Sequence, residues 1–171
     1  MNEFYLIDSP SFAKLKELKN EYSNLDITSV LLYLEIQKAY KKMKLNHDVF
    51  LQKFDLSESK FTIMMLLSYE KDKMLSPSAL SEKIGSKKST ITGVLKGLEK
   101  KGLVRRKILS EDKRTNYVQL TDFGLGKLQE FLPYNYEVVS KVFEVFSEEE
   151  KEQFYRLANK LKNNLEKDDL F

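Results

Sequence analysis

The 171-residue chain contains no cysteine and a single histidine, His47. Without cysteine the chain can form no disulfide, no thiolate metal site and no thiol-based redox sensor. A zinc site takes several histidine or cysteine ligands, so one histidine argues against that metal. We therefore expect neither a bound metal nor a cofactor.

Long apolar runs and a secretory signal are also missing. No segment approaches the ~20 apolar residues of a membrane span, and the first residues, MNEF, lack a basic stretch followed by an apolar run. These absences predict a cytoplasmic protein. Neither a glycine-rich phosphate loop nor a serine or cysteine nucleophile motif accompanies His47, so an enzyme is the weakest of the function classes considered.

Positive charge is concentrated in one segment of the chain. Residues 76–121 contain eleven Lys and Arg against four Asp and Glu, a local balance of +7, although the whole chain carries only +3. The remainder is therefore near −4. This asymmetry predicts one module that binds a polyanion with salt-dependent affinity.

The basic segment begins with a short helix. Ser76 followed by Pro77 is typical of a helix start, because the serine oxygen caps backbone donors and proline loses no hydrogen bond at the first position. Leu80 and Ile84 lie four residues apart on one face, and Gly85 can adopt the left-handed conformation that ends a helix. A helix over 77–84 is predicted.

A second helix follows directly and closes at 100–102. Its predicted buried stripe consists of Ile91, Val94, Leu95 and Leu98. Its opposite face carries Lys88, Ser89, Thr92, Gly93 and Lys96, which are small or hydrogen-bonding residues suited to lying against DNA. Residues 103–108 and 116–120 then read as strands joined by a charged loop, and Thr121-Asp122 starts another helix. The order of helix, turn, helix and basic hairpin predicts a winged helix-turn-helix.

Several motifs in this segment resemble the MarR family of bacterial transcription regulators. They are LSPSAL at 75–80, Ile84-Gly85, TITG at 90–93, LEKKGLVRR at 98–106 and SEDKRTNYVQLT at 110–121. Asp112 and Arg114 occupy the Asp-x-Arg positions of the family's wing. The motifs span about a quarter of the chain, and the helical flanks extend the resemblance from Asp26 to Glu166.

The resemblance implies that the second helix contacts phosphates and base edges, and that Arg114, oriented by Asp112, enters the minor groove. The residues expected at the DNA are Ser76, Ser78, Lys87, Lys88, Ser89, Thr90, Thr92, Lys96, Arg105, Arg106, Asp112, Lys113 and Arg114. The alternatives are a purely structural cap for Ser76, solvated side chains for single members of the set, and a solvated ion pair in the loop. Lys87 stands where relatives commonly carry a Ser or Thr cap, so either Ser86 caps a longer helix or Lys87 contacts phosphate.

Helices are expected on both flanks. One begins at Ser9-Pro10, and a longer one begins at Asp26 and runs to about Phe50 or Phe54. An almost wholly apolar helix over 58–70 is expected at the centre of the core. After it, one helix runs from 122 past Pro133, and the last one begins at the capping box of Ser147 and Glu150. Its apolar stripe consists of Phe154, Leu157, Leu161 and Leu165.

These patterns predict a mainly α fold with a small β-wing, in which a DNA-binding domain is flanked by dimerisation helices. The predicted domains are N-terminal dimerisation helices at 1–53, the winged helix-turn-helix at 54–121, and C-terminal linking and dimerisation helices at 122–171. In the family, the first and last helices of two subunits interlock. The alternative is that the flanks pack only within one chain.

The resemblance also implies a function, namely a homodimeric regulator on a pseudo-palindromic operator with half-sites ~10 base pairs apart. Repression is the default, with activation left open, and the protein would associate with the nucleoid when bound to DNA. A small aromatic or phenolic effector would release it from DNA. The candidate effector residues are Tyr33, Tyr40, His47, Phe50 and Phe61, for which core or dimer packing is the alternative. The other function considered is a winged helix used for protein contacts.

Overall fold

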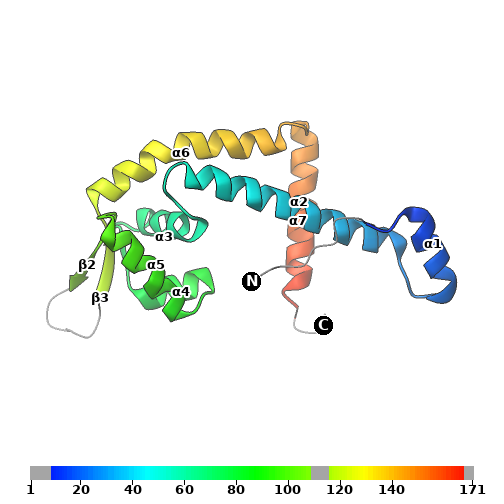
Figure 1. The fold of residues 1–171 in the computed structure, drawn as a ribbon, viewed down its shortest axis with the longest axis horizontal. Helices are drawn as coiled ribbons and strands as arrows, with labels where there is room; N and C mark the ends of the chain where they lie inside the picture. Colours follow the sequence, from blue (N-terminus) through cyan, green and yellow to red (C-terminus); the bar gives the residue numbers. More distant parts are fainter. Residues whose placement is uncertain (1–8, 109–115, 168–171) are drawn as a thin grey trace. The chain divides into compact units, whose positions relative to one another are not determined.

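The computed structural model describes residues 9–108 and 116–167 (Figure 1). The described part contains seven α-helices and a three-stranded sheet, which confirms the predicted mainly helical class with a small sheet. The chain divides into two compact units, Met1–Lys53 and Phe54–Phe171. No helix among the described residues is long and apolar enough to cross a membrane.

The first unit contains α1 (Phe12–Glu21) and α2 (Ile27–Gln52). The predicted start of α1 at Ser9-Pro10 is wrong, because the hydroxyl of Ser11 accepts the backbone N–H of Lys14 and the helix begins after it. The predicted start of the long helix at Asp26 is confirmed to within one residue. Asp26 is its N-cap, and its carboxylate accepts hydrogen bonds from Ser29 and Thr28. These hydrogen bonds lower the pKa of Asp26, and the bond from the Ser29 hydroxyl contributes most.

The second unit is built on α3 (Glu58–Tyr69), α4 (Pro77–Ile84) and α5 (Lys88–Lys100). Ser57 caps α3, whose backbone N–H at Lys60 donates to the serine hydroxyl. The core of the unit is mainly aliphatic, with one aromatic ring at its centre. Its fully buried side chains include Ile63, Met64, Leu67, Leu80, Leu95, Leu98, Val118, Leu128 and Phe131. The predicted central role of the apolar helix α3 is confirmed, since three of these side chains belong to it.

A sheet with the order β1-β3-β2 closes one side of this core. Its strands are β1 (Met74–Leu75), β2 (Val104–Ile108) and β3 (Asn116–Leu120), and both pairings are antiparallel. The pair β2 and β3 was predicted, and the two-residue strand β1 was not. β1 is too short for a periodic signal, and it forms because β3 offers it a free edge. Figure 1 shows β2 and β3 beside α5 at one end of the unit.

Two long helices complete the second unit, namely α6 (Asp122–Phe143) and α7 (Glu148–Leu165). α6 continues through Pro133, as expected. It packs on α3, where the ring of Phe131 meets Phe54 and Phe61 edge-on, with centroids 5.0 and 5.2 Å apart. The predicted capping box at the start of α7 is confirmed, because Ser147 and Glu150 exchange both hydrogen bonds.

Candidate nucleic-acid interface

Serine hydroxyls and backbone geometry fix the start of α4 and the turn between α4 and α5. Ser76 caps α4 by accepting the backbone N–H of Ala79 at 3.1 Å, which confirms its predicted structural role. Gly85, with a φ of +65°, ends α4 in the left-handed conformation. The Ser81 hydroxyl then donates to the carbonyl of Ser86. These local contacts set the direction in which α5 leaves the turn.

One stripe of α5 is buried, and this places its other face in solvent. Ile91, Leu95 and Leu98 are each at most 2% exposed, and they recur at spacings of four and three residues. The predicted contact residues of this segment are all exposed: Lys87, Lys88, Ser89, Thr90, Thr92 and Lys96. Packing of the stripe therefore leaves these six side chains in solvent, five of them on α5 and Lys87 at its N-cap.

The start of α5 lacks a side-chain cap. Lys87 is the N-cap residue, and its side chain makes no capping hydrogen bond. The alternative in which Ser86 caps a longer helix is therefore wrong; the helix begins at Lys88. Backbone N–H groups in a first helical turn have no partner within the helix, and with the macrodipole they favour an anion. An ammonium at the cap position adds positive charge to the same end.

The lysines on this surface are not neutralised by described neighbours. Lys87, Lys88 and Lys96 form no ion pair with any residue in 9–108 or 116–167. Thr92, in contrast, donates its hydroxyl to the carbonyl of Lys88 at 2.9 Å. Exposed and unpaired ammonium groups are suited to phosphate oxygens, which bind lysine through charge attraction.

Two predicted arginines brace the base of the hairpin. Arg105 donates from Nε and Nη2 to Oε1 of Gln119, its direct partner on β3, at 3.0 and 2.9 Å. Gln119 in turn donates to the carbonyl of Asp72. Arg106 pairs with Glu99 of α5 at 2.8 Å. Both guanidinium groups therefore fix β2 against its neighbours, while the predicted residues Asp112, Lys113 and Arg114 lie outside the described residues.

Sequence reasoning missed two of these supporting residues, Gln119 and Glu99. The position of Gln119 opposite Arg105 follows once the hairpin register is known, and the sequence alone does not give that register. Ser78, the remaining predicted residue, is exposed in the first turn of α4.

An ion pair joins the far end of α5 to the segment before α3. The ammonium of Lys101, the residue that ends α5, binds the carboxylate and the carbonyl of Asp55. This hydrogen bond and the attraction to Lys101 lower the pKa of Asp55. Burial, and then the charge of Lys101, lower the pKa of Lys60. The contact therefore connects two segments of the core that are distant in the chain.

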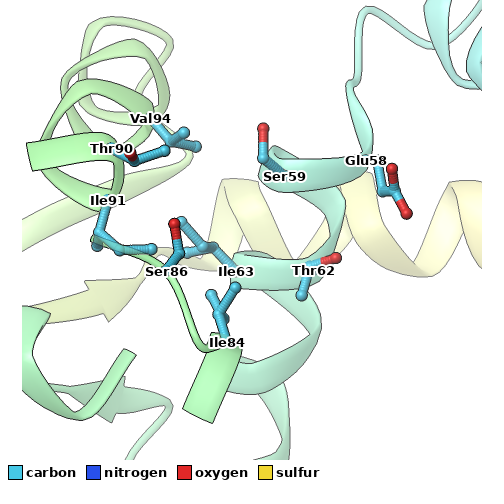
Figure 2. Close-up of a pocket in the computed structure, with 9 residues that line it drawn as sticks. All are labelled: Glu58, Ser59, Thr62, Ile63, Ile84, Ser86, Thr90, Ile91 and Val94. Carbon is cyan, nitrogen blue, oxygen red and sulfur yellow. The ribbon is translucent and has the colours of Figure 1, made fainter. Parts of the chain in front are cut away.

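A pocket of about 220 Å³ lies between α3, the α4–α5 turn and the first turns of α5 (Figure 2). Four of its lining residues are aliphatic and four carry hydroxyls: Ile63, Ile84, Ile91, Val94, Ser59, Thr62, Ser86 and Thr90. Glu58 completes the lining, which includes no cation. The pocket is therefore a gap in packing beside the exposed face of α5, and its chemistry does not suit an anion.

The sequence match to known proteins covers this same region and most of the chain. The model of the MarR family matches residues 56–115. The HTH-type transcriptional repressor YetL of Bacillus subtilis is 38% identical over 152 residues, which cover 89% of this chain and 91% of YetL. The chain belongs to the MarR family. Members of this family are transcriptional regulators and not enzymes.

Other MarR-type proteins agree in length and fold. The transcriptional repressor MprA of Escherichia coli is 25% identical over 92% of this chain and 90% of its own. The MarR family regulator Sco3205 of Streptomyces coelicolor, solved in complex with DNA, has a TM-score of 0.75 and 20% identity, over 85% of this chain and 92% of its own. The predicted winged helix-turn-helix is thereby confirmed as the fold.

The residues expected at a MarR effector site do not lie in one unit. Phe61 lines a groove of about 360 Å³ between α3 and α6, together with Tyr69, Asn135 and Tyr136. The other four, Tyr33, Tyr40, His47 and Phe50, lie on α2 in the first unit. The rings of His47 and Phe50 stack there with centroids 6.3 Å apart, and Tyr33 and Tyr40 are exposed. Within the described residues, no cluster of metal-binding side chains occurs.

Proposed function

We propose that this MarR family protein is a homodimeric repressor that binds a pseudo-palindromic operator through α5 and the hairpin. The observation that carries the proposal is the exposed surface of α5 and its N-cap, where six polar or cationic side chains lie in solvent while the stripe of Ile91, Leu95 and Leu98 is buried. α5 would lie in the major groove, and the hairpin would follow the neighbouring backbone. Residues 54–121 would form the DNA-binding domain and the flanks the dimerisation helices, acting on DNA in the cytoplasm.

Two findings on relatives support this reading. YetL and MprA are both named as repressors, and Sco3205 has been solved with DNA. The charge distribution of the chain agrees with them, since its positive excess falls within 76–121. A winged helix used only for protein contacts has no need of unpaired lysines at the start of its second helix.

The dimer is supported by the surface of α7, in which no residue is buried. Leu157, Leu161 and Leu165 are 57%, 43% and 53% exposed and recur at helical spacing. Phe154 of the same stripe contacts Phe143 and Phe146 at the α6–α7 corner. An apolar stripe of this length is stabilised by burial against a second copy.

The effector proposal rests on the groove between α3 and α6. Its walls are mainly apolar, and it offers the buried amide of Asn135 and the hydroxyls of Tyr69 and Tyr136 as polar groups. Its volume lies in the range of small-molecule sites. A small uncharged phenolic compound bound there would weaken DNA binding if it favours the dimer conformation that does not fit the operator.

The test is selection of genomic DNA fragments by the purified protein at ~0.15 M salt, followed by sequencing. A recovered palindrome with half-sites ~10 base pairs apart supports the repressor. Replacing Lys96 with Gln should then weaken binding to all fragments and lower the salt slope by about 1. Lys127→Gln, which removes the same charge from α6, serves as the control. Salt-sensitive binding with no shared site would contradict the proposal.

The effector is tested on the recovered operator with phenol as the probe. The expected result is weaker operator binding at saturating phenol, and no such change in a Phe61→Ala variant that binds the operator normally. Equal operator affinity with and without the probe would reject a small phenolic compound of this kind as the effector.

A further inference from the structure

Gly93 stands in the middle of α5, where nothing in residues 9–108 or 116–167 accounts for a glycine. It is exposed, and a Cβ added to it would meet no heavy atom within 4 Å. Its φ is not in the left-handed region, so an L side chain would be unstrained. Glycine in a helix interior is destabilising relative to alanine, because it loses more conformational freedom on folding. The helix is therefore weaker here, and no contact within the described part of the chain compensates for it.

The position of Gly93 on the helix is specific. At 3.6 residues per turn it shares its face with Ser89, Lys96 and Lys100, all exposed and all opposite the buried stripe. A hydroxyl and two ammonium groups therefore surround a stretch of bare backbone. Among residues that the structure describes, no side chain reaches over this stretch to within 4 Å of the missing Cβ.

The other glycine of the same helix differs in what it faces. A Cβ at Gly97 would lie 3.8 Å from Cε of Lys60, which is an ordinary packing contact with α3. Gly97 is half-buried and Gly93 is exposed. Gly126 in α6 is exposed in open space like Gly93, but α6 carries none of the proposed DNA contacts. The chain thus provides two matched controls.

We propose that Gly93 is a specificity-determining residue, which lets the backbone of α5 approach base edges in the major groove more closely than any side chain permits. The inference rests on the proposed function. Base edges carry sequence information and phosphates do not. A methyl group at Gly93 therefore weakens binding to the operator and leaves binding to unrelated DNA unchanged, since unrelated DNA is held through its phosphates.

The experiment compares full-length Gly93→Ala, Gly97→Ala and Gly126→Ala with the wild type. Operator affinity, affinity for unrelated duplex DNA and melting temperature are measured for each protein. All three variants should melt at or above the wild-type temperature, because alanine favours the helix. Gly93→Ala should lose about tenfold or more in operator affinity, comparable to one mismatched base pair, and the two control variants should stay within about twofold of the wild type.

Three results separate the possible failures. Wild-type operator affinity in Gly93→Ala overturns this inference and leaves the proposed function intact. An equal loss in Gly93→Ala and Gly97→Ala also overturns it, because the cause is then a stiffer helix and not close approach. A wild-type protein that selects no sequence overturns the proposed function, and the inference with it.

Discussion

At the scale of single residues, Gly124 has the least freedom to change. It lies in the first turn of α6, and a Cβ there would stand 2.1 Å from the carbonyl oxygen of Leu103 and 3.0 Å from Cδ1 of Leu120. The backbone of α6 must move away from Leu103, the residue before β2, to admit any side chain. Thr121, which caps α6 and donates to the carbonyl of Gly102 at 2.7 Å, would have to move with it.

We expect Gly124→Ala to lower the free energy of unfolding by about 2 kcal/mol or more, the range of overpacking in a filled core. Urea denaturation followed by circular dichroism measures the loss. Gly126→Ala, two residues further along α6 in open space, should instead stabilise the protein by ~0.5–1 kcal/mol. Equal stability of the two variants would contradict the close packing of Gly124 against the backbone of Leu103.

Lys87 combines a structural weakness with a proposed function, and the two can be separated. Lys87→Ser supplies the missing cap of α5 and should raise the free energy of unfolding by about 1 kcal/mol. It also removes an ammonium from the first turn, so DNA affinity should fall and the salt slope should drop by about 1. Denaturation and binding measured on one preparation test both signs. A variant that is more stable and binds DNA as well as the wild type would remove Lys87 from the interface.

At the scale of elements, the pair of Asp55 and Lys101 connects the segment before α3 with the end of α5. The pKa of Asp55 is lowered in the folded protein, mainly by its hydrogen bond to Lys101. The pair therefore stabilises the fold above the ordinary carboxyl pKa of ~4, and this contribution is lost as the pH falls through the lowered value. Asp55 has a φ of +56°, which Asn tolerates as well as Asp does.

Asp55→Asn should thus remove the charge without straining the backbone. The expected result is a lower melting temperature than that of the wild type at pH 7 and a difference that shrinks as the pH falls below ~4. Thermal melts at a series of pH values provide the measurement. Glu130→Gln, which breaks a pair with Lys127 three residues away inside α6, is the control and should change little, because that pair connects no distant segments. A constant difference at every pH would show that Asp55 acts through packing and not through charge.

At the scale of the whole molecule, association is the property with the largest consequence for function. Leu161→Asp places a charge in the apolar stripe of α7, and a buried unpaired charge is costly. We expect the variant to sediment as a monomer and to lose most of its operator affinity, because two linked recognition helices bind far more tightly than one. Asn163→Asp puts the same charge on the opposite face of α7 and should remain a dimer.

A Leu161→Asp protein with the sedimentation coefficient of the wild type would exclude this stripe from the interface. Circular dichroism of both variants shows whether α7 is still folded. Should Leu161→Asp unfold, the milder Leu157→Ser leaves the helix intact and tests the same stripe by its dissociation constant.

Local signals account for the parts of the fold that could be predicted. The starts of α4, α6 and α7 follow from the N-cap residues Ser76, Thr121 and Ser147. The hydroxyl of each accepts a hydrogen bond from the backbone N–H three residues further along the chain. The buried stripe of α5 follows from its spacing. The strand β1 and the close approach at Gly124 were not predictable, because both depend on partners that the chain brings together only after folding.

The sequence by itself determined the family and the concentration of positive charge in 76–121. It also determined the polar exposed face of α5 and the apolar stripe of α7, since helical periodicity and capping act over three or four residues. Only the tertiary structure decided that Arg105 binds Gln119, that Lys101 binds Asp55 across 46 residues, and that α5 begins at Lys88 without a side-chain cap from Lys87. It also showed that a Cβ at Gly93 would meet no described atom within 4 Å, while one at Gly97 would contact Lys60. The physical reason is that strand register and helix packing bring together groups whose separation in the chain gives no local signal.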